Sequence, residues 1–326
     1  MSTIHCSPEI LDQNDFQNIL KQWDIKFETI RPDIPICGSP ERTSYRVVVS
    51  DSVNQLYLLE MFAEDRIFHK QQISIILDHL YDRDIQSIIP YLKSLDGDHI
   101  VSYHDVYWQL IPFIEGVSLN RPHHVKDHWR GKTSATFLID FWKKTDTIKI
   151  PTSLCQFSLK DYVLKMSETM KTYHPERHGQ LLSVLNWLRN DFFSIYESIP
   201  KRFCHGDFHP LNIIWSNHGI NAVIDWEFLG LKPEMYDMAN MIGCLGIEHP
   251  SALFDRFAYS FIHEIIDSEL IDSQSVNYLL ECITAIRFAW LAEWFRKSDN
   301  DMIDLEITYI NLLKDNGEYL KEQWDI

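Results

Sequence analysis

The stretch that decides the fold is His205–Asn212, which reads HGDFHPLN, and it is followed by Val223–Phe228, which reads VIDWEF. Between these motifs, two short runs of β-branched and aromatic residues flank Asn217-His218-Gly219. Two such runs around a glycine-containing turn are typical of a β-hairpin. We therefore expect the two motifs to meet at the open end of one hairpin.

The register of this hairpin predicts a metal site. If His218-Gly219 form a two-residue turn, Asn212 faces Asp225, whereas a bulge or a three-residue loop shifts the pairing by one residue. Directly opposed side chains lie on one face, with β-carbons about 5 Å apart, so an amide oxygen and a carboxylate can share one ion. Such ligands suit Mg²⁺, which takes one or two carboxylates plus substrate phosphates. Glu227 joins the same face if the strand continues, as a ligand, as a support for the ligands or as a half-exposed strand carboxylate.

Asp207 precedes Asn212 on a loop that Pro210 interrupts, so its carboxylate can point at a substrate hydroxyl. His205 and His209 flank this carboxylate, and they offer a second hypothesis, in which both histidines bind the metal of a hydrolase. That hypothesis needs further ligands from distant loops. No second cluster in the sequence points clearly to them.

The motifs resemble the catalytic and metal loops of protein-kinase-like phosphotransferases, which use H-x-D-x-x-x-x-N followed by an Asp. HGDFHPLN with IDWEF is more closely similar to the aminoglycoside phosphotransferase and choline kinase group of small-molecule kinases. This resemblance implies an α+β, two-lobed protein-kinase-like fold with a β-rich N-terminal lobe and a larger helical lobe. It also implies ATP and Mg²⁺ as cofactors and phosphate transfer to a hydroxyl of a small-molecule acceptor.

The resemblance implies a role for each matching residue of the catalytic region. Asp207 is then the base, or the carboxylate that orients the hydroxyl, and Asn212 and Asp225 are the Mg²⁺ ligands. His205 shapes the loop. Asp237, in the sequence YDMA, matches a family Asp that braces the catalytic loop.

Hydrophobic patterning predicts a β-rich first part and a helical second part, with a boundary at Glu115-Gly116. We therefore predict a nucleotide-binding lobe over residues 1–115 and a catalytic and substrate lobe over residues 116–326. The predicted strands are Tyr45–Val49, Gln55–Phe62 and Val106–Phe113, and the predicted helices start at Ser7-Pro8 and cover Phe68–Tyr81, Leu181–Ile195 and Leu279–Trp294.

The family pattern also places the nucleotide in the first lobe. A loop that precedes the first hairpin is expected to cover the phosphates, and the backbone at the end of the third predicted strand is expected to form the hinge that contacts adenine. The implied nucleotide-binding residues are Gly38, Ser39, Arg46, Glu60, Ile111, Phe113 and Ile114.

Glu60 departs from the family pattern. In Leu58–Met61, which reads LLEM, it takes the strand position where the family usually carries an ATP-binding Lys. A carboxylate cannot pair directly with phosphates. Either Arg46, Arg66 or Lys70 supplies the cation, or the nucleotide is held differently, or the protein is a catalytically weak pseudokinase that binds a nucleotide or metabolite.

Charge restricts the partners. The chain has 326 residues and a formal charge of −17, and residues 201–326 contribute 9 Lys+Arg against 21 Asp+Glu. This balance argues against nucleic acid. It favours an amine-bearing acceptor, such as an aminoglycoside, choline or an amino alcohol, with a neutral sugar as the alternative. The side chains expected at the acceptor are His209, Trp226 and Glu227, and Trp226, Trp290 or Trp294 can offer a cation–π face.

Two further features of the sequence bear on the compartment. No apolar run approaches the roughly 20 residues of a membrane span, and the N-terminus lacks the pattern of a signal peptide. The six cysteines are scattered without a C-x-x-C pair, which is typical of thiols in a reducing compartment. We expect a cytoplasmic protein without a membrane partner.

Overall fold

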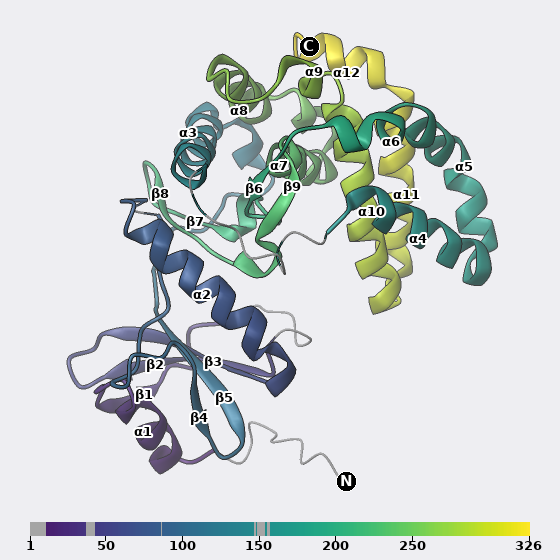
Figure 1. The fold of residues 1–326 in the computed structure, drawn as a ribbon. Helices are drawn as coiled ribbons and strands as arrows, with labels where there is room; N and C mark the ends of the chain where they lie inside the picture. Colours follow the sequence, from purple (N-terminus) through teal and green to yellow (C-terminus); the bar gives the residue numbers. More distant parts are fainter. Residues whose placement is uncertain (1–10, 37–42, 86, 147, 149–153, 155–156) are drawn as a thin grey trace. The chain divides into compact units, whose positions relative to one another are not determined.

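The computed structural model describes residues 11–36, 43–85, 87–146, 148, 154 and 157–326. The chain divides into two compact units, Met1–Gly116 and Val117–Ile326 (Figure 1). Among the described residues, no helix combines the length and the apolar character needed to cross a bilayer.

The first unit is built on an antiparallel sheet with the strand order β1-β2-β3-β5-β4. Its strands are β1 (Phe27–Ile30), β2 (Tyr45–Asp51), β3 (Leu56–Phe62), β4 (Val101–Tyr103) and β5 (Val106–Pro112). The predicted hairpin and the third predicted strand are thereby confirmed. The short strands β1 and β4 were not predicted.

Two helices, α1 (Gln13–Lys21) and α2 (Ile67–Tyr81), cover opposite faces of this sheet (Figure 1). Side chains of a strand alternate between the faces, so Leu59 packs in the core beside α1 while Glu60 points to the face covered by α2. The predicted helix over residues 68–81 is confirmed. The predicted start at Ser7-Pro8 lies outside the described residues, and α1 follows a capping box formed by Asp12 and Asp15.

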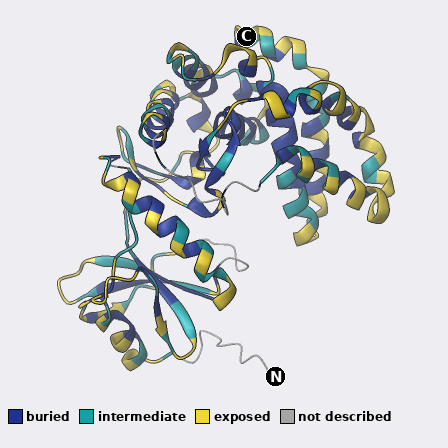
Figure 2. Cartoon of the chain, in the orientation of Figure 1, coloured by how far each residue is buried: buried dark blue, intermediate teal, exposed yellow. Residues whose placement is uncertain are grey.

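The second unit is mainly helical, and its helices bury one side and expose the other (Figure 2). Its helices are α3 (His128–Thr145), α4 (Leu159–Tyr173), α5 (Pro175–Asn190), α6 (Phe192–Ile195), α7 (Tyr236–Glu248), α8 (Arg256–Asp267), α9 (Ser273–Val276), α10 (Leu279–Lys297), α11 (Asn300–Asp315) and α12 (Gly317–Gln323). The predicted helix over residues 279–294 is confirmed as part of α10. The predicted continuous helix over residues 181–195 is wrong, because the backbone of Asp191 leaves the helical conformation (φ −99°, ψ −87°) and separates α5 from α6.

Two small antiparallel ladders lie between these helices. β6 (Lys201–Cys204) pairs with β9 (Gly230–Pro233), and β7 (Ile213–Trp215) pairs with β8 (Ile220–Val223). The β7–β8 pair is the predicted hairpin, whereas the β6–β9 pair joins segments that sequence patterning did not connect. Together they hold both motifs in one place.

Candidate active site

The loop that carries Asp207 follows β6 and begins with a glycine that no other residue can replace without strain. Gly206 has φ +85°, and a β-carbon there would lie 2.1 Å from the carbonyl O of Phe228 and 2.6 Å from Cε of Lys232. Both the backbone conformation and the close packing therefore require glycine. This turn follows the end of β6 and leads directly to Asp207.

His205 connects the two motifs through both nitrogens of its ring. Nε2 lies 3.0 Å from the carbonyl O of Ile224, and Nδ1 accepts the backbone N–H of Asp207 at 3.1 Å. A carbonyl only accepts and an amide N–H only donates, so the ring must be neutral with its proton on Nε2. Burial lowers the pKa of His205 to about 4, which keeps this form at neutral pH.

Asp237, the first acidic residue of α7, binds the backbone of the same loop. Its Oδ2 accepts the backbone N–H of His205 at 2.7 Å, and its Oδ1 accepts that of Gly206 at 2.8 Å. Burial raises the pKa of Asp237 to about 6, against the lowering effect of these two hydrogen bonds and of the Lys232 charge. These contacts are the ones that the predicted bracing role requires.

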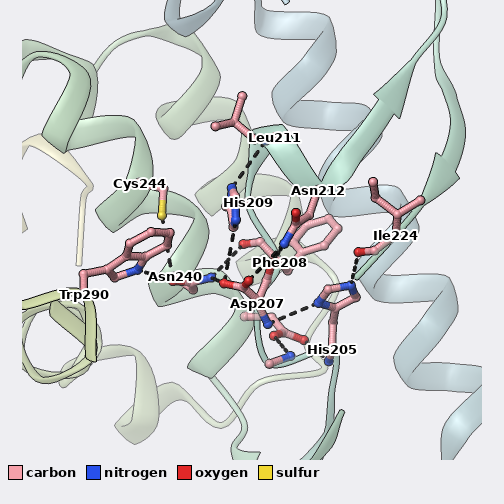
Figure 3. Close-up of polar contacts among 12 residues, drawn as sticks. His205, Asp207, Phe208, His209, Leu211, Asn212, Ile224, Asn240, Cys244 and Trp290 are labelled. Atoms are coloured by element: carbon pink, nitrogen blue, oxygen red, sulfur yellow. Dashed lines mark hydrogen bonds and ion pairs between the residues drawn. The ribbon is translucent and has the colours of Figure 1, made fainter. Parts of the chain in front are cut away.

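Asp207 and Asn212 are joined directly (Figure 3). Nδ2 of Asn212 donates to the backbone O of Asp207 at 2.9 Å and to its Oδ2 at 3.0 Å. The side chain of Asp207 keeps 17% of its surface exposed. Because the amide nitrogen of Asn212 is directed at Asp207, its amide oxygen is the atom that can bind a cation.

The predicted register of the hairpin is wrong by one residue. Ile213 pairs with Val223, and the N–H of Ile224 donates to the backbone O of Asn212 at 2.9 Å, so Asn212 lies opposite Ile224 rather than Asp225. The turn lies one residue earlier than predicted, since the N–H of Ser216 donates to the backbone O of Gly219 at 2.9 Å, and the pairing then shifts by one residue between Trp215–Ile220 and Ile214–Ala222. Asp225 then adopts a left-handed conformation (φ 62°, ψ 63°), which turns the chain out of the hairpin.

The same turn changes the positions of Trp226 and Glu227. β8 ends at Val223, and residues 226–228 form a 3-10 turn, so the continuing strand that would place Glu227 beside Asp225 is absent. Glu227 is buried. Trp226 is also buried, donates from Nε1 to Val223 and packs on the ring of His205 at 4.3 Å, so the prediction of an open cation–π face on Trp226 is wrong.

His209 lies beside the Asp207 carboxylate, with its Nε2 3.7 Å from Oδ1, while its Nδ1 accepts the N–H of Leu211 at 3.4 Å. The hydrolase hypothesis fails on His205, because both of its ring nitrogens are engaged with the backbone. Nor do the described parts of the chain gather three or more His, Cys, Asp or Glu side chains around a common point that suits a metal. A Mg²⁺ site made of one amide, one carboxylate and substrate phosphates does not require such a cluster.

In the first unit, Glu60 is surrounded by cations. Nε of Arg46 lies 2.6 Å from Oε1 of Glu60, and Nζ of Lys70 on α2 lies 3.8 Å from Oε2. The hydroxyl of Tyr91 donates to Oε2 at 3.0 Å. Both Glu60 and Lys70 are buried, whereas Arg46 is part-exposed. Of the three cations proposed to replace the family Lys, these contacts place Arg46 and Lys70 at Glu60; Arg66 lies in the turn before α2.

The other predicted nucleotide contacts are only partly described. Gly38 and Ser39 lie outside the described residues. Ile111 pairs with Leu58 in the sheet, and the N–H of Phe113 already donates to the backbone O of Leu56 at 2.9 Å. The amide N–H of Phe113 is therefore engaged within the sheet, and the adenine contact predicted for the backbone of residues 111–114 stays a prediction.

Asn240, a polar residue at the site, was not predicted from the sequence. Asn240 on α7 donates from Nδ2 toward Oδ1 of Asp207 at 3.4 Å. A signal for it was present, because Asn240 follows Asp237 by three residues and side chains at this spacing share one face of a helix. Asp237 and Asn240 thus hold the loop from the same helix.

The model of the phosphotransferase enzyme family matches residues 59–264, which contain both motifs. The chain belongs to this family. The chain is therefore an enzyme of the phosphotransferase class. No curated protein sequence gives a significant match.

Solved structures of small-molecule kinases share the fold. An amicoumacin kinase in complex with AMP-PNP, Ca²⁺ and Ami has a TM-score of 0.69 at 12% identity and covers 94% of each chain. A microcompartment-associated aminopropanol kinase has a TM-score of 0.68 at 14% identity, covering 96% of this chain and 99% of its own. A choline kinase from Streptococcus pneumoniae has a TM-score of 0.62 at 13% identity, covering 92% and 98%. The predicted α+β, protein-kinase-like fold is confirmed.

Proposed function

We propose that this phosphotransferase moves the terminal phosphate of ATP, in the presence of Mg²⁺, to a hydroxyl of a small amine-bearing acceptor. The observation that carries the proposal is the joint placement of Asp207 and Asn212. Asn212 fixes one oxygen of a part-exposed carboxylate that stands at the tip of the catalytic loop. A carboxylate held in this way can orient an attacking hydroxyl and accept its proton.

The oxygen donors of the two motifs fit Mg²⁺. Asn212 offers an amide oxygen, and Asp225 offers a carboxylate at the turn that follows β8. Bound by these residues and by substrate phosphates, Mg²⁺ would offset the negative charge of the transferring group. Glu227 has no strand to place it at this site, so we assign the metal to Asn212 and Asp225 alone.

The class of acceptor rests on two arguments. The acidic balance of residues 201–326 suits a cationic substrate. Solved structures with this fold include kinases named for aminopropanol, which carries an amine, and for choline, which carries a quaternary ammonium group. Trp290 and Trp294 are neighbouring rings on α10. Each already has a cation of this chain over its face, Arg287 over Trp290 and Lys297 over Trp294. We therefore expect acidic side chains, and not these two tryptophans, to bind the cationic group of the acceptor.

The test is acceptor-dependent formation of ADP from ATP. A panel of aminoglycosides, choline, amino alcohols and neutral sugars is incubated with the protein, with Mg²⁺ or with EDTA. We expect turnover with an amine, loss of turnover in EDTA, and a fall of at least about 100-fold in Asp207→Asn. Asp267→Asn, a matched change at an exposed position of α8, should leave turnover unchanged. Full activity in Asp207→Asn would rule out the proposed role, and turnover of sugars alone would rule out the amine.

Glu60 favours a second candidate function, that of a weakly active protein that binds nucleotide or metabolite. The buried carboxylate stands on β3 where the family usually carries a Lys, and its contacts engage two of the three candidate cations, Arg46 and Lys70. ATP binding without turnover of any compound in the panel would support this candidate. Ordinary turnover with any acceptor would exclude it.

A further inference from the structure

Asn240 concentrates four polar contacts on one buried side-chain amide (Figure 3). Its Nδ2 donates to Oδ1 of Asp207 at 3.4 Å and to the carbonyl O of Phe208 at 3.4 Å. Its Oδ1 accepts from Nε1 of Trp290 at 3.5 Å and from Sγ of Cys244 at 3.9 Å. These contacts join the catalytic loop, α7 and α10.

The chemistry of the four partners fixes the orientation of this amide. A carboxylate and a carbonyl accept hydrogen bonds, whereas an indole N–H and a thiol donate them. Turning the amide by 180° would place its oxygen against two acceptors and its nitrogen against two donors. An Asp at the same position would have nearly the same shape, but it would set a second negative charge against Asp207.

We propose that Asn240 is a positioning residue for phosphoryl transfer, holding the second oxygen of the Asp207 carboxylate. This inference rests on the proposed function. Asn212 donates to Oδ2 and Asn240 to Oδ1, so each carboxylate oxygen has its own amide donor and rotation of the carboxylate is opposed from both ends. Trp290 keeps the Asn240 amide turned toward Asp207 through the indole N–H.

Two substitutions separate this role from plain packing. Asn240→Leu removes the amide donor at similar volume. Asn240→Asp keeps the shape but replaces the donating nitrogen with a negatively charged oxygen, which repels the Asp207 carboxylate. We expect both to lower kcat by about ten- to a hundredfold, because misplaced reacting groups cost that much, with KM for ATP within about twofold of wild type. Asn186→Asp adds the same charge at an exposed position of α5 and should leave kcat and KM unchanged. A kcat within twofold of wild type in Asn240→Leu overturns the proposal.

A second measurement does not depend on activity. In urea denaturation, Asn240→Asp should lower the unfolding midpoint, and the double variant Asp207→Asn/Asn240→Asp should recover at least half of that loss, because it restores one amide and one carboxylate to the pair. Absence of recovery overturns the contact. If wild type phosphorylates no acceptor while the double variant recovers stability, the proposed function fails and the Asn240–Asp207 contact stands.

Discussion

The His205 ring connects the backbone of Asp207 with that of Ile224, the residue before Asp225. It can make both hydrogen bonds only when the ring is neutral. Nε2–H donates to Ile224, and Nδ1 accepts from Asp207. A proton on Nδ1 would set two N–H groups against each other. The contact therefore predicts that acid weakens the fold through this one side chain.

The size of the effect follows from the pKa. Burial lowers the pKa of His205 from the usual 6.5 to about 4. At about 1.4 kcal/mol for each pKa unit, this difference contributes about 3 kcal/mol to the free energy of unfolding. The contribution is complete above pH 6.5. It is lost as the pH falls toward 4, because the unfolded chain takes up the proton first.

The assay is urea denaturation of wild type and His205→Gln at a series of pH values between 4 and 7.5. Burial raises the pKa of Asp237 to about 6, which gives that residue a stability slope of opposite sign, but it is present in both proteins and cancels in their difference. We expect the advantage of wild type over His205→Gln to shrink by about 3 kcal/mol between pH 7 and pH 4. The exposed His218→Gln should show no such trend. A difference that does not vary with pH would refute the assigned tautomer and burial effect.

Three other substitutions test the surroundings of the site. In thermal denaturation, Gly206→Ala should lower the free energy of unfolding by about 2 kcal/mol or more, because φ is positive and the added carbon would lie 2.1 Å from a carbonyl O. Gly219→Ala should cost less than about 1 kcal/mol, because the nearest atom to its added carbon is the Ser216 hydroxyl at 3.7 Å. Glu306→Gln should lower the free energy of unfolding by about 3–5 kcal/mol, because it breaks the buried two-point ion pair with Arg287 at 2.5 and 2.6 Å. The double variant Arg287→Met/Glu306→Leu should recover most of this loss. A double variant as unstable as the single variant would count against buried charge as the cause. Arg46→Gln should weaken ATP binding about tenfold in a titration with a fluorescent nucleotide, and an unchanged Kd would show that other groups hold the phosphates.

Much of the fold was predictable because its signals are local. Runs of β-branched, aromatic and leucine residues on both sides of a turn predicted the β2–β3 hairpin. Apolar residues at three- and four-residue spacing predicted α2 and α10, since this spacing marks one buried helix face. The motif HGDFHPLN was likewise informative, because Gly206 and Pro210 restrict the backbone whatever lies around them. The family and the position of Asp207 beside Asn212 follow from such local constraints.

Other features of the site depend on contacts between distant segments. The register that places Asn212 opposite Ile224 depends on the irregularity after Ile214, and the left-handed turn at Asp225 removed the strand expected to carry Glu227. Neither feature has a distinct sequence pattern, because Asp adopts the left-handed conformation only where its surroundings stabilise it.

By itself, the sequence determined the motif loops, the β2–β3 hairpin, the helices α2 and α10 and the identity of the acidic residues, because these follow from backbone preferences and side-chain chemistry over a few neighbouring positions. The tertiary structure alone decided which groups hold those acids. Asp237 and Asn240 approach the loop from α7, and Trp290 approaches Asn240 from α10. Segments this far apart in the chain meet only when helices pack, and packing is governed by the shape of whole buried faces, which a linear pattern does not record.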